Sequence, residues 1–167
     1  PTQVGSLTTW LQVNAGRYSM GAIKTDGTLW TWGQNQDGKL GLGTTGINTS
    51  SPIQVGSLTN WKQINFSNSF DFTAAVKIDG TLWVWGGNIY GNLGQSNLTD
   101  YSSPVQVGAL TNWAQVAVGR YGIRAIKTDG TLWAWGGNGY GQLGQNNTIS
   151  YSSPVQVGAD TNWEKVA

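Results

Sequence analysis

Short runs rich in apolar and β-branched residues follow one another along this chain, and no stretch carries an apolar stripe at helical spacing over three turns. An Asp-Gly pair interrupts these runs at 26–27, 79–80 and 129–130. Such a pair between two apolar runs is a strong signal for a β-hairpin, because the tight type I′ turn needs positive φ. The pattern therefore predicts an all-β protein.

Three sequence markers return at a nearly constant interval. The segment Lys24–Trp30 recurs as Lys77–Trp83 and Lys127–Trp133, and the motif Pro-x-Gln-Val-Gly begins at Pro52, Pro104 and Pro154. The third marker is a tryptophan, found at Trp10, Trp61, Trp113 and Trp163. Successive marker tryptophans lie 51, 52 and 50 residues apart. A period of about 50 residues is typical of a four-stranded β-propeller blade.

These markers divide the chain into propeller repeats at 1–51, 52–103 and 104–153, with the start of a fourth at 154–167. In the third repeat we expect strands over residues 114–118, 124–128 and 131–136, and an outer strand over 154–157 that opens on its proline. Residues 1–5, a shifted copy of the proline marker, belong to an outer strand in this phasing. Propellers have about 4–8 blades. We therefore expect further blades on both sides of the chain, or several copies that complete a ring.

The run Asp129–Gly144, continued by Pro154-Val155-Gln156-Val157, resembles the signature of regulator of chromosome condensation repeats. Asp79–Gly94 and Asp26–Gly41 keep the same pattern. The resemblance implies blades of four antiparallel strands, in propellers that usually have seven blades. The chain departs from the family because it lacks the His-Ser pair of many members, and because its second repeat has two extra residues within Phe66–Phe72.

The amino-acid composition argues against several classes of function. Nine basic residues stand against eight acidic ones with no basic stripe, so we expect no nucleic-acid partner. Without histidine or cysteine, the common nucleophile–base pairs and zinc thiolate sites are missing, and we predict no enzyme, cofactor or metal. We also expect no membrane insertion, because no run of 18 apolar residues occurs. Only 10% of the residues are charged, which suggests an extracellular, cell-surface or virion-surface location.

The acidic residues and tryptophans have structural explanations. Asp26, Asp79 and Asp129 belong to the hairpin turns, where aspartate side chains bond the local backbone. None of the remaining carboxylates lies within three residues of another in the sequence; they are Asp37, Asp71, Asp100, Asp160 and Glu164. We expect the Trp-x-Trp pairs to pack inside and between blades; they are Trp30 and Trp32, Trp83 and Trp85, and Trp133 and Trp135. The four marker tryptophans should also pack between blades, nearer their edges.

Three functions stay open. The blades form a structural or interaction module for protein partners or further copies of the repeat; or they bind a glycan or peptide through rim loops; or they regulate guanine-nucleotide exchange, as the resemblance implies. Exchange would need a wedge inserted in one blade, whereas the insertion here is two residues. The candidate binding residues lie in equivalent turns and in the exits of third strands: Arg17, Tyr18, Asn68, Phe70, Tyr90, Arg120, Tyr121 and Tyr140.

Overall fold

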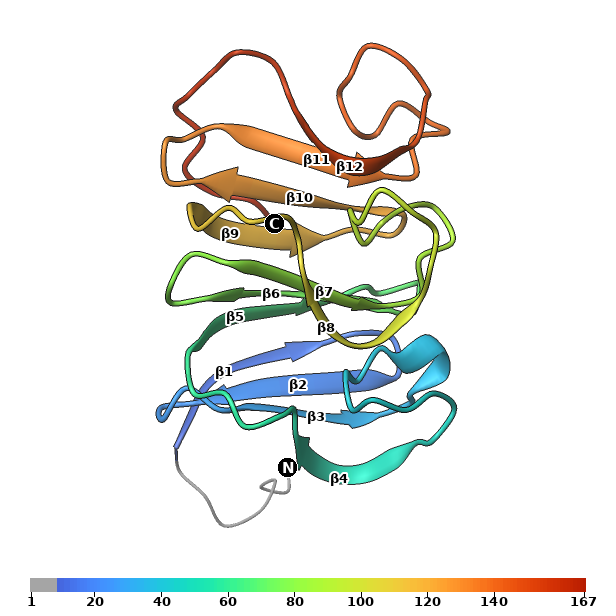
Figure 1. Cartoon of the computed structure of the whole chain (residues 1–167), viewed down its shortest axis with the longest axis vertical. Coiled ribbons are helices and arrows are strands. Elements are labelled where there is room, and N and C mark those ends of the chain that lie inside the picture. Colours follow the sequence, from blue (N-terminus) through green and yellow to red (C-terminus); the bar gives the residue numbers. More distant parts are fainter. Residues whose placement is uncertain (1–8) are drawn as a thin grey trace.

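The computed structural model describes residues 9–167 and forms three four-stranded antiparallel sheets, stacked one on the next (Figure 1). The first sheet contains β1 (Trp10–Ala15), β2 (Ser19–Lys24), β3 (Leu29–Gly33) and β4 (Thr49–Gln54), with a short 3-10 turn η1 (Gln36–Gly38) before β4. The second contains β5 (Trp61–Phe66), β6 (Phe72–Lys77), β7 (Leu82–Gly86) and β8 (Tyr101–Gln106). The third contains β9 (Trp113–Val118), β10 (Gly122–Lys127), β11 (Leu132–Gly136) and β12 (Tyr151–Gln156). The predicted all-β class and blade architecture are confirmed; we call the sheets blades 1, 2 and 3.

The first three strands of blade 3 begin and end within two residues of the sequence prediction, whereas the outer strand differs more. The outer strand of blade 3 begins at Tyr151, so Pro154 lies inside β12 and does not open it. The register of β12 on β11 shifts between Ala134 and Gly136, which places the proline in an irregular stretch of an edge strand. A residue without an N–H is tolerated there because no ladder bond is lost. The outer strand expected over residues 1–5 lies outside the described residues.

The Asp-Gly hairpins close in a different way from the predicted type I′ turn. Only the glycine has positive φ, for example 77° at Gly27, and the preceding Asp26 does not. The N–H of Gly27 bonds the carbonyl of Lys24, which is the pattern of a three-residue loop ending in a glycine bulge. A Cβ on Gly27 would also lie 1.9 Å from the carbonyl oxygen of Thr59, so the approach of the next blade requires glycine as well.

The core lies between the blades. Blades 1 and 2 bury a cluster that includes Ile23, Leu29, Leu40, Val55, Trp61, Ile64 and Trp85. Blades 2 and 3 bury the equivalent set, which includes Val76, Leu82, Leu93, Val107, Trp113, Val116 and Trp135. Trp85 donates its indole N–H to the carbonyl of Lys39 in blade 1 at 2.8 Å, and Trp135 donates to Asn92 in blade 2 at 3.0 Å. The second tryptophan of a Trp-x-Trp pair therefore joins two blades.

The other tryptophans are buried to different degrees. Trp83 lies half-buried under the Lys77 ammonium, whose nitrogen is 3.6 Å from the ring centroid. The marker residues Trp61 and Trp113 are each 2% exposed, as expected for packing between blades. Trp163 is 41% exposed, and no strand of a fourth blade lies beside it within residues 9–167, so its packing between blades stays a prediction.

Side-chain amides join the first strands of successive blades. Gln12 of β1 accepts a hydrogen bond from the backbone N–H of Ile64 in β5 at 3.1 Å. Gln63, the equivalent residue of β5, accepts from the N–H of Val116 in β9 at 3.0 Å and donates to its carbonyl at 2.9 Å. These glutamines satisfy backbone groups that no neighbouring strand reaches, and they thereby fix the register between blades.

We predict that Trp85→Ala destabilises the protein by about 3–5 kcal/mol, because it empties a fully buried site between two blades and removes the bond to Lys39. Urea unfolding followed by tryptophan fluorescence measures the loss. Ile78→Thr is the control, since Ile78 is 69% exposed and threonine stands in its place in the other repeats. Its effect should stay within about 0.5 kcal/mol. Equal effects of the two variants would contradict this account of the core.

Candidate functional site

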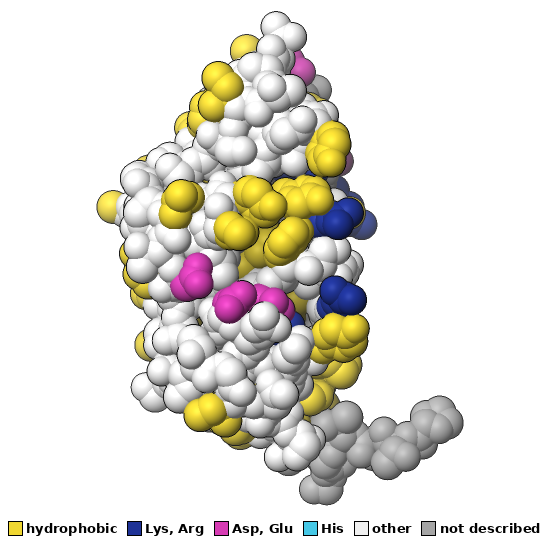
Figure 2. Space-filling model, turned by 90° about the vertical axis from the view of Figure 1, so that its right-hand side faces the viewer, with side chains coloured by type: hydrophobic (Ala, Val, Ile, Leu, Met, Phe, Trp, Pro, Cys, Tyr) yellow, Lys and Arg dark blue, Asp and Glu magenta, His cyan; other side chains and the backbone are white. Residues whose placement is uncertain are grey.

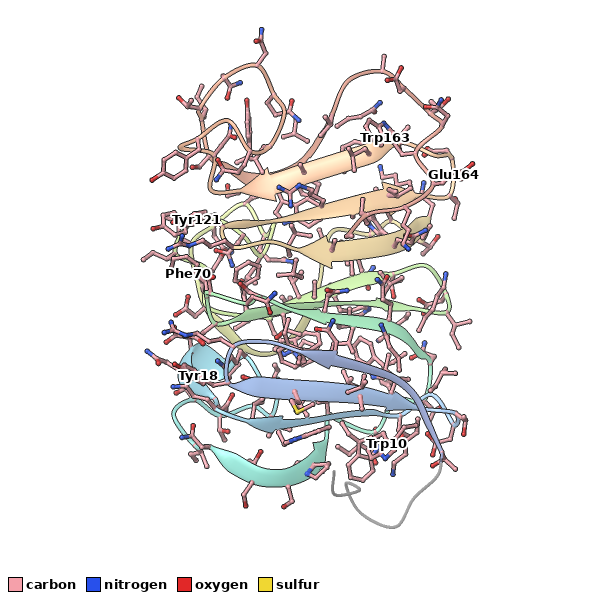
Figure 3. The ribbon with its side chains drawn as sticks, turned by 180° about the vertical axis from the view of Figure 1, so that it is seen from behind. Trp10, Tyr18, Phe70, Tyr121, Trp163 and Glu164 are labelled. Carbon is pink, nitrogen blue, oxygen red and sulfur yellow. The ribbon has the colours of Figure 1, made fainter. Side chains whose placement is uncertain are left out.

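Two kinds of loop lie at one edge of the stacked blades. The turns between first and second strands, at residues 16–18, 67–71 and 119–121, lie there together with the long connections from third to fourth strands. Figure 3 shows Tyr18, Phe70 and Tyr121 at this edge, with Trp10 and Trp163 at the opposite one. We call this edge the loop rim. The antiparallel order of each blade brings these loops to one side.

A buried asparagine holds each long connection of the loop rim in place. Asn88 is fully buried, and its side-chain carbonyl accepts the N–H of Leu93 at 2.9 Å. Its amide donates to the carbonyls of Asn97 and Thr99, both at 3.0 Å. Asn138 makes matching bonds in blade 3. The side chains at the loop tips are therefore presented by a fixed backbone. Sequence reasoning missed this role, although an asparagine follows each third strand at the same place.

Four predicted candidates meet on the loop rim: Phe70, Tyr90, Tyr121 and Tyr140. The ring centroid of Phe70 lies 5.7 Å from Tyr90 and 5.2 Å from Tyr121. Tyr121 in turn lies 5.5 Å from Tyr90 and 6.4 Å from Tyr140. Tyr140 is 86% exposed and Tyr90 37%, whereas the other two are half-buried. We call these residues the aromatic cluster; Figure 2, which looks onto the loop rim, shows hydrophobic side chains gathered there.

The remaining candidates lie beside the cluster or apart from it. The guanidinium carbon of Arg120 lies 5.0 Å from the ring centroid of Tyr121, so the cation borders the cluster. Arg17 is placed in the same way over Tyr18, at 4.9 Å, but Tyr18 is not part of the cluster. Asn68 is exposed in the same turn as Phe70. The two extra residues of the second repeat therefore lengthen the turn that carries Phe70, a member of the aromatic cluster.

Carboxylates converge next to the aromatic cluster, which the sequence did not predict. Asp37, Asp71 and Asp100 line a cavity of about 620 Å³ together with Phe70 and Asn88, and we call this cavity the acidic cleft. Figure 2 shows acidic side chains side by side just beneath the hydrophobic group. The three carboxylates come from three different loops of two blades. One sequence signal was available, because Asp37 occupies the position that holds a tyrosine in the other two repeats.

The carboxylates of the acidic cleft are held in different ways. Asp71 forms an ion pair with the buried ammonium of Lys39 at 2.5 Å. Asp100 accepts the backbone N–H of Asn88 at 2.7 Å. Asp37 has neither an ion pair nor a hydrogen-bond partner among residues 9–167. Burial, followed by the negative charges of Asp71 and Asp100, raises the pKa of Asp37 above its ordinary value.

The repeated aspartates of the hairpin turns act structurally, as predicted. Asp79 accepts hydrogen bonds from the N–H of Thr81 at 3.0 Å and from its hydroxyl at 2.6 Å. The same hydroxyl accepts the indole N–H of Trp83 at 2.8 Å, and the other two hairpins repeat the arrangement. The hydroxyl bond is the largest cause that lowers the pKa of Asp79.

Two features are absent from the part of the chain that the structure describes. No group of three or more acidic side chains within residues 9–167 is arranged to hold a metal ion. Over the same range, the structure contains no helix that is long and apolar enough to cross a membrane.

Comparisons with known proteins agree with the repeat architecture. The family model of the regulator of chromosome condensation (RCC1) repeat matches residues 26–76, 79–126 and 129–167. The human probable E3 ubiquitin-protein ligase HERC3 is 35% identical over 99 residues, which are 59% of this chain and 9% of that protein. The ultraviolet-B receptor UVR8 of Arabidopsis thaliana is 34% identical over 96 residues, which are 58% of this chain and 22% of the receptor.

Solved structures give the same result for the fold. The crystal structure of human WBSCR16 matches with a TM-score of 0.80 at 25% identity, over 94% of this chain and 40% of that one. Prp20p of Saccharomyces cerevisiae matches with a TM-score of 0.78 at 19% identity, over 92% of this chain and 39% of that one. The chain thus spans about two fifths of these structures and less than a quarter of the two relatives described above.

We predict that the turn aspartates make the stability of the protein depend on acid pH. The threonine bonds lower the pKa of Asp26, Asp79 and Asp129, so the fold favours their ionised forms. That contribution is present above the unfolded pKa of about 3.9 and is lost as the pH falls through the lower folded values. The urea midpoint of the native protein should therefore fall more steeply between about pH 5 and pH 2 than that of the triple variant Asp26→Asn, Asp79→Asn, Asp129→Asn. Parallel curves would show that the turns do not contribute in this way.

Proposed function

Because the chain belongs to the regulator of chromosome condensation (RCC1) repeat family, we propose that it is a non-catalytic interaction module that binds a protein partner through the aromatic cluster of its loop rim. The observation that carries the proposal is the convergence of four aromatic side chains, from loops of two blades, at an exposed edge. Tyrosine and arginine are enriched among the residues that dominate protein interfaces. A tyrosine ring also covers a large area with few rotatable bonds.

The geometry of the cluster suits a preformed binding surface. Phe70 and Tyr121 are half-buried and hold the exposed rings of Tyr90 and Tyr140 from below. The loops that carry the two exposed rings are fixed by Asn88 and Asn138. A partner would therefore meet ordered side chains and lose little free energy in ordering them.

Glycan binding, the second function that the sequence left open, has less support from the structure. Sugars need free hydrogen-bonding groups beside an aromatic ring. The amide of Gln142 instead accepts the N–H of Tyr140 and donates to the carbonyl of Gly137. The amide of Asn92 likewise donates to Gly87. These two amides thus hold the loops themselves.

Guanine-nucleotide exchange would need a wedge inserted in one blade, and residues 9–167 contain no such insertion. The longest turn between first and second strands is residues 67–71, and its Phe70 packs into the aromatic cluster. Prp20p is described with binding to Gsp1p and histones, which are protein partners of a protein with this fold. For this chain, the likeness to Prp20p supports a protein as the class of partner and no particular protein. The extracellular or surface location stays a prediction.

We expect the loop rim to select binding peptides from a phage-displayed library of random 12-residue peptides. Binding of the selected peptides should weaken at least about tenfold in the double variant Tyr90→Ser, Tyr140→Ser, which removes the two exposed rings. Fluorescence polarisation with the selected peptides measures the change. Ile78→Thr, on a hairpin at the opposite edge, is the matched control and should bind like the native protein. Peptides that ignore the double variant, or a library without any binder, would overturn the proposal.

A further inference from the structure

We propose that the segment bound by the loop rim places a basic side chain, lysine or arginine, in the acidic cleft, next to an apolar or aromatic residue that contacts the aromatic cluster. The inference rests on the proposed function and adds the chemistry of the partner. The observation behind it is a groove that is aromatic on one side and acidic on the other, with Phe70 lining both parts.

The acidic cleft is built across the junction of blades 1 and 2. Asp37 comes from the long connection of blade 1, whereas Phe70, Asp71 and Asp100 come from blade 2. The Asp37 carboxylate lies against the backbone of blade 2, since a Cβ built on Gly87 would be 3.3 Å from its Oδ2. The Asp37 side chain is exposed, so its negative charge lies at the junction of the two blades, where a partner can reach it.

The cations in and beside the acidic cleft do not neutralise its three carboxylates. Lys39 is buried and committed to Asp71, and its nitrogen also reaches the side-chain oxygen of Gln34 at 3.3 Å. Arg17 also lines the cleft but is placed over the ring of Tyr18. Three carboxylates thus face two cations, and Asp37 has no described partner. A third cation from outside would complete the set.

A cation in this position would also meet an aromatic ring. Phe70 lines the cleft, and a lysine or arginine group within about 6 Å of a ring centroid is attracted to the ring face. The rest of the cluster continues from Phe70 to Tyr90 and Tyr121. The residue next to the basic one would therefore lie over the cluster, which gives the partner a two-part signature.

The junction of blades 2 and 3 differs from the junction of blades 1 and 2 in the residue that one loop position presents. Tyr90 holds there the position that Asp37 holds in blade 1: a Cβ on Gly137 would lie 3.4 Å from the Cβ of Tyr90, and one on Gly87 would lie 3.4 Å from the Cβ of Asp37. The same backbone site thus presents a carboxylate at one junction and a ring at the next. This difference makes the groove directional and selects a basic residue at one end.

The test uses the peptides selected on the native protein. We expect them to contain lysine or arginine beside an apolar residue, and their affinity to fall about tenfold when the basic residue becomes norleucine. Asp37→Asn should reduce the affinity by a similar factor. Asparagine suits this variant because it tolerates the positive φ of 53° at residue 37. Asp160→Asn is the control, since Asp160 is exposed on the connection to Trp163 at the opposite edge.

The outcomes separate the inference from the proposed function. Loss of affinity in both Asp37→Asn and the norleucine peptide, with none in Asp160→Asn, supports the basic side chain in the acidic cleft. Peptides that depend on Tyr90 and Tyr140 but carry no basic residue and ignore Asp37→Asn would overturn the inference and leave the proposed function standing. A library without a peptide that depends on the two tyrosines overturns both. Circular dichroism of each variant confirms that the fold is intact.

Discussion

Each blade of this chain can bury its apolar side chains only against a neighbouring blade, because a single four-stranded sheet has no core of its own. The contact that meets this need is the indole of the second tryptophan in each Trp-x-Trp pair. Trp85 and Trp135 reach the loop carbonyls of Lys39 and Asn92 in the preceding blade. A Cβ on Gly94 would lie 2.7 Å from the indole nitrogen of Trp135, so the loop must keep a glycine beside the ring. The constraint couples the third strand of one blade to the long connection of the blade before.

That coupling explains which loop positions are constant and which differ. In the three long connections, the buried asparagine and the buried leucine five residues later recur at equivalent places, as in Asn88 and Leu93. Both serve the interior, the first by closing the loop and the second by filling the junction. The position between them that faces out holds Asp37, Tyr90 or Tyr140. The chain can therefore change its surface chemistry at this position while the backbone stays the same.

The sequence predicts what depends on local pattern and periodicity. The repeat of about 50 residues gave the blades, the Asp-Gly pairs gave the hairpins, and equivalent loop positions placed Phe70, Tyr121 and Tyr140 at one edge. It did not predict the acidic cleft, because Asp37, Asp71 and Asp100 are more than 25 residues apart and meet only when two blades pack. The turn type was wrong for a local reason: an Asp-Gly pair also suits a three-residue loop in which only the glycine has positive φ, as at Gly27.

Binding at the loop rim and packing of the blades depend on the same junctions. The aromatic cluster takes its rings from blades 2 and 3, and the acidic cleft takes its carboxylates from blades 1 and 2. A segment that occupies both would touch all three blades at once. Such a segment has its complete surface only when the blades are docked, so it binds the folded chain in preference to the unfolded one and stabilises it by mass action. In a repeat protein, where each blade contacts only its neighbours, a partner across two junctions supplies the longer-range connection that the chain itself lacks.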